Sequence, residues 1–150
     1  MNKIVVLQGA GNRGKSTTLK IVYEHLLNKF SLLAEERVTS GGRAMYRLDV
    51  RSDVRAIFSV NGKYVGIESQ GDPNSRLRDS LDFFQRKRCD LIICATRTRG
   101  DTTDIVRALD PPYSIEWVAK SVAVGDASQH QCNSRDAATI ISSITAIAAS

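Results

Sequence analysis

The sequence predicts an α/β fold: a mostly parallel five-stranded sheet with one antiparallel hairpin strand and helices on both faces. Short β-branched apolar runs alternate along the chain with segments whose apolar residues recur at helical spacing. An Asn61-Gly62 pair between two strand-like runs predicts one tight hairpin. The 150 residues, 42% of them hydrophobic, suit one folded domain spanning residues 1–150.

The first half of the chain contributes three of the expected strands and one helix. Residues 3–7 are a continuous apolar run, typical of a strand covered on both faces. A glycine-rich turn over residues 9–14 leads into a helix, whereas the polar residues 31–43 predict a loop. Two strands are expected over residues 45–60 and 63–68. The apolar face of the helix comprises Leu19, Val22, Tyr23, Leu26 and Phe30.

The second half alternates helices and strands, which is typical of a parallel sheet. We expect a buried strand over residues 90–95, a short helix over 101–109 that ends before a pair of prolines, and a strand over 114–124. Asn133 or Ser134 is expected to cap the last helix. The apolar faces of the two longer helices comprise Leu77, Leu81 and Phe84, and Ala137, Ile140, Ile141, Ile144, Ile147 and Ala148.

Composition argues against several classes of protein. The sequence has no run of roughly 18 apolar residues, so no membrane-spanning helix is expected. Its three cysteines form no C-x-x-C pair and only two histidines accompany them, which argues against a dedicated zinc site. Residues 3–7 are too short an apolar stretch for an export signal. With reduced cysteines, we expect the chain in the cytoplasm.

The charge balance is compatible with an anionic ligand. Lysine and arginine number 21 against 16 acidic residues, which gives a net charge of +5. Such an excess suits a nucleic acid, a phosphate-bearing small ligand or simple solubility. Apart from Arg86-Lys87-Arg88, the basic residues are spread along the chain, so a nucleic-acid partner is not expected.

The most informative stretch is Gly9–Ser16, which reads G-A-G-N-R-G-K-S and matches G-x-x-x-x-G-K-[ST] at every fixed position. Glycines let the backbone curl and turn successive N–H groups inward, which makes a concave site for anions. The N-terminus of the following helix adds a partial positive charge. Lys15 is expected to reach the β and γ phosphates of a nucleotide, Ser16 to bind Mg²⁺ and Thr17 to lie near the α phosphate.

This strand–loop–helix segment resembles the Walker A motif of the P-loop NTPase superfamily, over about the first thirty residues. The resemblance implies the three-layer P-loop fold and a nucleoside triphosphate bound with Mg²⁺. It also implies that the triphosphate is held by Gly9, Gly11, Asn12, Arg13, Gly14, Lys15, Ser16 and Thr17.

A carboxylate is expected near the Mg²⁺, and Glu68 is the first candidate. It ends the run Lys63–Glu68, which we expect to be a strand that neighbours the one before the glycine-rich loop. With Gly71 it resembles the D-x-x-G switch of small GTPases, with Glu in place of Asp. The resemblance implies that Gly71 donates its N–H to the γ phosphate and that Glu68 or Gln70 orients water. Asp72 is the second candidate; the alternatives are an exposed carboxylate at Glu68 and a helix cap at Asp72.

The third candidate region is the loop Ala95–Asp101, which follows the strand expected over 90–95. Arg97 or Arg99 is expected to stabilise charge on a transferring phosphoryl group, as an internal arginine finger does. The alternative is that both are solvated loop charges. Residues 98–101 resemble the guanine-reading N-K-x-D motif only in part, because Asn and Lys are lacking. ATP is therefore expected rather than GTP.

The sequence thus predicts Mg-dependent binding and hydrolysis of a nucleoside triphosphate. Two alternatives remain: a kinase acting on a small molecule or nucleotide, and a GTPase-like switch that binds a protein partner. The switch would reorder residues 34–43 and 68–76. A chain of this length leaves little room for the acceptor-binding loops of a kinase. The candidate catalytic residues are Lys15, Glu68, Arg97 and Arg99, and the candidate metal ligands are Ser16, Glu68 and Asp72.

Overall fold

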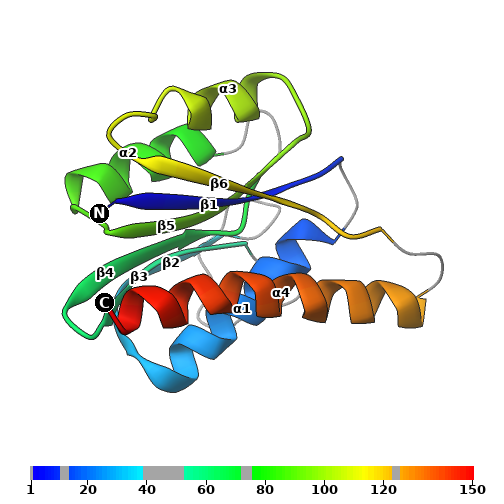
Figure 1. Ribbon diagram of the computed structural model, residues 1–150, viewed down its shortest axis with the longest axis horizontal. Helices are drawn as coiled ribbons and strands as arrows, with labels where there is room; N and C mark the ends of the chain where they lie inside the picture. Colours follow the sequence, from blue (N-terminus) through cyan, green and yellow to red (C-terminus); the bar gives the residue numbers. More distant parts are fainter. Residues whose placement is uncertain (1, 11–13, 39–52, 72–75, 123–125) are drawn as a thin grey trace.

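The computed structural model describes residues 2–10, 14–38, 53–71, 76–122 and 126–150. Within these residues the chain forms one six-stranded sheet flanked by four helices (Figure 1), which confirms the α/β class. The strands are β1 (Lys3–Gln8), β2 (Ser31–Val38), β3 (Asp53–Val60), β4 (Lys63–Glu68), β5 (Leu91–Thr96) and β6 (Ser114–Ala119). The helices are α1 (Lys15–Lys29), α2 (Leu77–Arg86), α3 (Asp101–Arg107) and α4 (Asp126–Ala148).

The strands lie in the order β2-β3-β4-β5-β1-β6. β4, β5, β1 and β6 run parallel, whereas β3 pairs antiparallel with both β2 and β4. The expectation of five strands with a single antiparallel hairpin strand is therefore wrong, since the described residues form a sixth strand and a second antiparallel pairing. The additional strand is β2, at one edge of the sheet, in a segment for which the sequence predicts a loop.

β2 lacks a recognisable sequence pattern because it is an edge strand. Its described side chains, Ser31–Glu35, are all exposed, so the segment has no alternation of apolar and polar residues. A register shift between Leu32 and Ala34 further breaks the period of two. Residues 39–43 of the expected loop lie outside the described residues.

The tight hairpin is confirmed. Asn61 and Gly62 join β3 to β4 with φ values of 50° and 84°, as a type I′ turn requires. The strand expected over residues 45–60 is present from the first residue of β3 onward, and residues 45–52 lie outside the described residues.

The C-terminal boundaries differ from the expected ones. The strand expected over residues 114–124 ends at Ala119, and α4 begins at Asp126 rather than at a cap formed by Asn133 or Ser134. The first turns of α4 read D-A-S-Q-H-Q-C, which has no apolar residues at helical spacing. The pattern therefore indicates only the later, apolar part of this helix.

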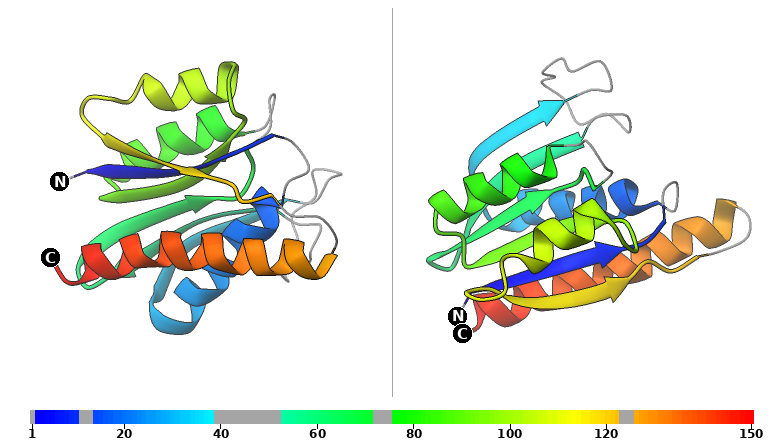
Figure 2. Two further views of the ribbon diagram at one scale, coloured as in Figure 1. Left: turned by 45° about the vertical axis from the view of Figure 1, so that its right-hand side comes forward. Right: turned by 90° about the horizontal axis from the view of Figure 1, so that it is seen from above.

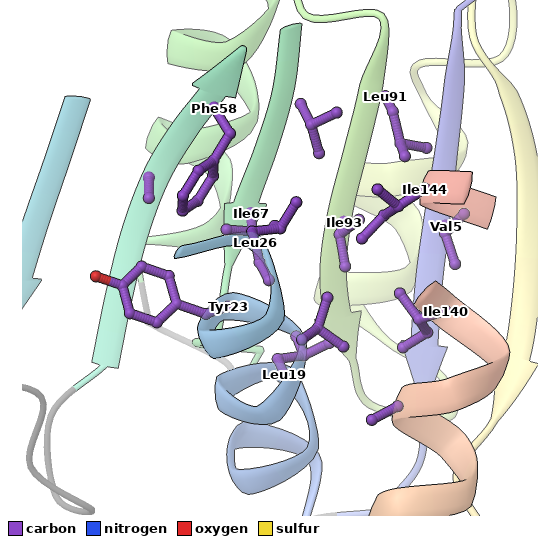
Figure 3. Packing of buried hydrophobic residues seen from close by; sticks show 14 of the residues in the cluster. Val5, Leu19, Tyr23, Leu26, Phe58, Ile67, Leu91, Ile93, Ile140 and Ile144 are labelled. Carbon is purple, nitrogen blue, oxygen red and sulfur yellow. The ribbon is translucent and has the colours of Figure 1, made fainter. Parts of the chain in front are cut away.

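Helices α1 and α4 cover one face of the sheet, and α2 and α3 cover the other (Figures 1 and 2). Side chains of β1 alternate between the two layers, so that Val5 faces α1 and α4 and Ile4 faces α2 and α3. In the first layer, Tyr23 of α1 lies edge-on to Phe58 of β3 with ring centroids 5.9 Å apart (Figure 3). Among the described helices, none is both long and apolar enough to cross a membrane.

The carboxyl ends of the parallel strands meet at one edge of the sheet. Gln8 of β1 lies opposite Thr96 of β5 on one side and Ala119 of β6 on the other. β3 runs the opposite way, so its first residue, Asp53, lies at this edge, close to the end of β4 at Glu68. Loops leaving this edge carry most of the polar residues discussed below.

Gly66 in β4 provides a test of the packing under α2. A Cβ built on Gly66 would lie 2.7 Å from Cδ1 of Phe84. We expect Gly66→Ala to lower the free energy of unfolding by about 1–3 kcal/mol, because the ring or the strand must shift. Urea denaturation measures this loss. In a double-mutant cycle with Phe84→Leu, the double variant should lose less than the sum of the single losses. Simple additivity would contradict the contact.

Candidate functional site

The glycine-rich loop joins β1 to α1, and its two described ends are closely packed. Gly9 follows β1, and its N–H donates to the carbonyl oxygen of Thr96 at 3.1 Å. A Cβ on Gly9 would lie 2.9 Å from Cβ of Lys120. Gly14 precedes α1 with a φ of 83°, in the left-handed region that favours glycine. Three residues between them were expected to hold phosphate: Gly11, Asn12 and Arg13. All three lie outside the described residues.

Lys15, the first residue of α1, is buried, with 6% of its surface exposed. Its Nζ donates to the carbonyl oxygens of Gly9 at 2.6 Å and of Thr96 at 2.9 Å. The ammonium therefore lies at the N-terminal end of α1, between the ends of β1 and β5. Burial removes water from the cation, and the two carbonyl oxygens offset part of that loss. A positive charge is thus fixed at the loop.

Ser16 and Asp53 form an oxygen pair at the start of α1. The hydroxyl of Ser16 donates to Oδ1 of Asp53 at 2.7 Å, and the hydroxyl of Ser69 donates to the same oxygen at 2.8 Å. Ser69 also accepts the N–H of Val54 at 2.9 Å, which ties the group to β3. Sequence reasoning missed Asp53 because the strand is expected to begin at residue 45, whereas Asp53 is the first residue of β3 and therefore lies at this edge.

The remainder of the first turn of α1 is polar. Thr17 is exposed, and its contact with a phosphate stays a prediction. Thr18 is buried, and its hydroxyl donates to the carbonyl oxygen of Gly14 at 2.8 Å. Within this turn, all of which is described, no residue is acidic. The positive end of the helix dipole is therefore not opposed by a carboxylate of that turn.

Glu68 lies elsewhere than expected. β5 separates β4 from β1, so the expectation that the strand of Glu68 neighbours the strand before the loop is wrong. The side chain is fully buried and accepts hydrogen bonds from Nε of Arg76 at 2.6 Å and from the hydroxyl of Ser80. Burial raises the pKa of Glu68 by more than the hydrogen bonds from Arg76 and Ser80 lower it. Glu68 thus ties β4 to α2, and its role at a metal or a water stays a prediction.

Gly71 contacts the backbone of the neighbouring strand. A Cβ on Gly71 would overlap the carbonyl group of Ala95 in β5. This close approach by itself requires glycine, and donation of the Gly71 N–H to a phosphate stays a prediction. Asp72, the second candidate for the metal, lies outside the described residues.

The loop after β5 leaves the sheet at the expected edge. The backbone of Arg97 is fixed, because its N–H donates to the hydroxyl of Thr102 and its carbonyl accepts the hydroxyl of Thr103, both at 2.9 Å. The Arg97 side chain is half-buried and Arg99 is exposed. α3 therefore holds this loop beside the end of β1, and contact of either arginine with a phosphoryl group stays a prediction.

A buried ion pair that sequence reasoning missed lies where β6 leads into α4. The side chain of Lys120 is 0% exposed, and its Nζ lies 2.8 Å from Oδ2 of Asp136. Asp136 also accepts the N–H and the hydroxyl of Ser121 at 2.8 and 2.7 Å. Burial acts to raise the pKa of Asp136, but the hydrogen bonds from Lys120 and Ser121 outweigh it and lower that pKa. No motif marks the pair, because its partners lie far apart in the sequence.

The first turns of α4 reach the other end of the loop. Asn133 is buried, and its Oδ1 accepts a hydrogen bond from Nε2 of Gln129 at 2.9 Å. A Cβ on Gly14 would lie 2.5 Å from that Oδ1 and 2.8 Å from that Nε2. The start of α4 therefore packs directly against the turn into α1.

The cysteines indicate no additional site in the part of the chain that the structure describes. Cys89 and Cys94 are buried. Burial, and then the charge of Asp90, raises the pKa of Cys89 to about 12, and burial also raises the pKa of Cys94. Both thiols therefore stay protonated near neutral pH. Among the described residues, no group of three or more His, Cys, Asp or Glu side chains is arranged to hold a metal ion.

Comparisons with known proteins identify no relative of this chain. No protein-family model matches it, and no curated protein or solved structure matches it significantly. The function is therefore argued from the site alone.

The conformation of Gly14 supplies a test of the loop. We expect Gly14→Ala to lower the free energy of unfolding by about 1–3 kcal/mol through backbone strain. The contact of the added Cβ with Asn133 should increase this loss further. Gly62→Ala is the matched control, because Gly62 has a φ of 84° with nothing within 4 Å of the added Cβ. Thermal unfolding of both variants measures the difference. Equal losses would contradict the contact between α4 and Gly14.

Proposed function

We propose that this chain binds a magnesium nucleoside triphosphate, ATP rather than GTP, at the Gly9–Ser16 loop and hydrolyses it. The observation that carries the proposal is Lys15, whose ammonium is buried at the N-terminus of α1 against the carbonyls of Gly9 and Thr96. An anion at the loop would meet this charge, the N–H groups of the first turn of α1 and the positive end of the helix dipole. A polyphosphate suits such a site because it carries several negative charges along its length.

Mg²⁺ is the cation that the proposal requires, and the oxygen atoms beside Lys15 fit it. Mg²⁺ takes oxygen ligands, and in nucleotide sites these are one or two carboxylates, phosphates and water. The hydroxyl of Ser16 and the carboxylate of Asp53, 2.7 Å apart, would hold it. Bound Mg²⁺ would neutralise part of the charge on the phosphate oxygens. Ser69 would keep the carboxylate oriented, because it donates to the same oxygen of Asp53.

Hydrolysis forms a bond from a water oxygen to the γ phosphorus and breaks the bond from that phosphorus to the β–γ bridging oxygen. The nucleoside diphosphate leaves with the electron pair, and the water gives up its proton to the phosphate or the solvent. Lys15 would stabilise charge on the β and γ oxygens. We assign to Arg97 or Arg99, from the loop beside β1, the stabilisation of charge on the transferred group.

Removing the Lys15 charge tests nucleotide binding. We expect Lys15→Met to weaken binding of Mg·ATP by about 10- to 150-fold, the range for lost hydrogen bonds to charged groups. Calorimetry measures the affinity, and circular dichroism checks that the fold is retained. Lys29→Met, in the last turn of α1, is the matched control and should bind as the wild type does. Unchanged binding by Lys15→Met would contradict the proposal.

The reaction itself is tested by phosphate release. The proposal predicts release of inorganic phosphate from Mg·ATP without any added acceptor, and loss of this release in Lys15→Met. Release that requires an added nucleoside or metabolite would favour a kinase. Binding without release under either condition would contradict hydrolysis while leaving nucleotide binding in place.

The role of Asp53 is tested by metal dependence. We expect Asp53→Asn to lose most of the gain in nucleotide affinity that Mg²⁺ gives the wild type, because an amide is a poor ligand for this ion. The measurement is calorimetric titration with ATP, with and without Mg²⁺. Asp79→Asn is the control, since Asp79 is an exposed carboxylate paired with Arg55. A full Mg²⁺ effect in Asp53→Asn would rule this carboxylate out.

A further inference from the structure

We propose that α4 and the residues directly after β6 position the two described ends of the glycine-rich loop, Gly9 and Gly14, for phosphate binding. At one end of the loop, the buried ion pair of Lys120 and Asp136 fixes Gly9. At the other end, the carboxamides of Gln129 and Asn133 fix the turn into α1. These four are positioning residues, because they act on the loop and not on the nucleotide. The effect on nucleotide affinity rests on the proposed function, whereas the effect on the loop rests on contacts of the free protein.

The Gly9 end depends on the stem and the charge of Lys120 together. The backbone N–H of Lys120 donates to the carbonyl of Gln8 at 2.8 Å, which continues the pairing of β6 with β1. Its Cβ would lie 2.9 Å from a Cβ on Gly9, so the stem lies directly against the loop. Asp136 holds the ammonium at 2.8 Å, and the carbonyl of Ser121 accepts it at 2.9 Å. Strand pairing at one end of Lys120 and the ion pair at the other therefore both act on the residue whose stem lies against Gly9.

The Gly14 end depends on two side-chain amides. Asn133 and Gln129 are hydrogen-bonded to each other at 2.9 Å, and both would touch a Cβ on Gly14. Gly14 accepts the N–H and the hydroxyl of Thr18 at its carbonyl, so its orientation sets the first turn of α1. The amide pair therefore acts on the segment that presents Lys15.

The buried face of α4 is polar in its first half, which contacts the loop, and apolar in its second half, which packs on the sheet. Asn133 and Asp136 lie on that face in the first half, and both are at most 5% exposed. Ala137, Ile140 and Ile144 continue the same face in the second half and belong to the core cluster. The face is polar where it meets the loop and apolar where it meets the sheet.

Packing alone would not require charges at this position. Moving an ion pair out of water costs free energy, and apolar residues of similar volume are often equally stabilising. The charged groups instead fix the orientation of the Lys120 side chain. Oδ2 of Asp136 accepts hydrogen bonds from both the Lys120 ammonium and the N–H of Ser121. The pair thereby fixes Lys120 and Ser121, directly after β6, relative to α4.

The test compares variants of the full chain by two readouts. The first is hydrogen exchange at the amides of Gly9 and Thr18, which donate to Thr96 and Gly14, measured by NMR without nucleotide. The second is the affinity for Mg·ADP, measured by calorimetry. Thermal unfolding of each variant reports global stability separately from both.

Asp136→Asn removes the charge with little change in size. We expect exchange at Gly9 to rise about tenfold, with a smaller rise at Thr18, and affinity for Mg·ADP to fall about tenfold, within the usual range of coupling between linked sites. Ile144→Ala is the matched control, because Ile144 is buried on the same helix about two turns beyond Asp136. Ile144→Ala should lower the free energy of unfolding but leave the affinity for Mg·ADP unchanged. The rate of exchange at the amides of Gly9 and Thr18, divided by the rate at the amides of β5, should also stay unchanged.

The double variant Lys120→Met/Asp136→Leu separates positioning from packing. It leaves no unpaired charge, so stability should return toward that of the wild type, while exchange at Gly9 stays fast and affinity stays low. The proposal would be overturned if the double variant recovered stability, slow exchange and affinity together. It would also be overturned if Asp136→Asn and Ile144→Ala changed exchange and affinity equally. If Asp136→Asn does not fold, the double variant supplies both readouts. If the wild type binds neither Mg·ATP nor Mg·ADP, the proposed function fails and hydrogen exchange alone decides this inference.

Discussion

A buried ammonium at the start of α1 is the constraint on which the rest of this site depends. Lys15 is removed from water and lies against the carbonyl oxygens of Gly9 and Thr96. Carbonyl dipoles offset only part of the lost hydration of a cation, so an anion brought to this position gains strongly. The ends of β1 and β5 must therefore stay aligned, because the carbonyl oxygens of Gly9 and Thr96 both accept hydrogen bonds from this ammonium.

Two elements outside the loop contribute to the surroundings of Lys15. The antiparallel run of β3 brings Asp53 to the carboxyl edge of the sheet, where it accepts the hydroxyl of Ser16. α4 brings Asn133 and Asp136 to the two ends of the loop. The lysine, the oxygen pair and the polar face of α4 thus lie at the described ends of the glycine-rich loop.

Sequence patterns predict the backbone of the site better than its side-chain partners. The loop before α1 and the hairpin at Asn61-Gly62 follow from the sequence, because both depend on contacts between near neighbours. Asp53 and Asp136 cannot be predicted in this way, since the first residue of β3 and the packing of α4 against the end of β6 place them. The strand of Glu68 is expected beside β1, but β5 lies between the two. Strand order depends on packing across the whole chain, which no local spacing encodes.

The most direct measurement is a titration of isotopically labelled protein with Mg·ADP, following the backbone amide resonances by NMR. Binding at the loop predicts the largest shifts at the amides of Gly14, Lys15 and Ser16, with smaller shifts at Gly9 and Asp53. Resonances of α2 and α3, on the other face of the sheet, should move little. Shifts centred on those two helices would contradict phosphate binding at this loop. The absence of shifts at about 1 mM nucleotide, the upper end of usual KM values, would contradict it as well.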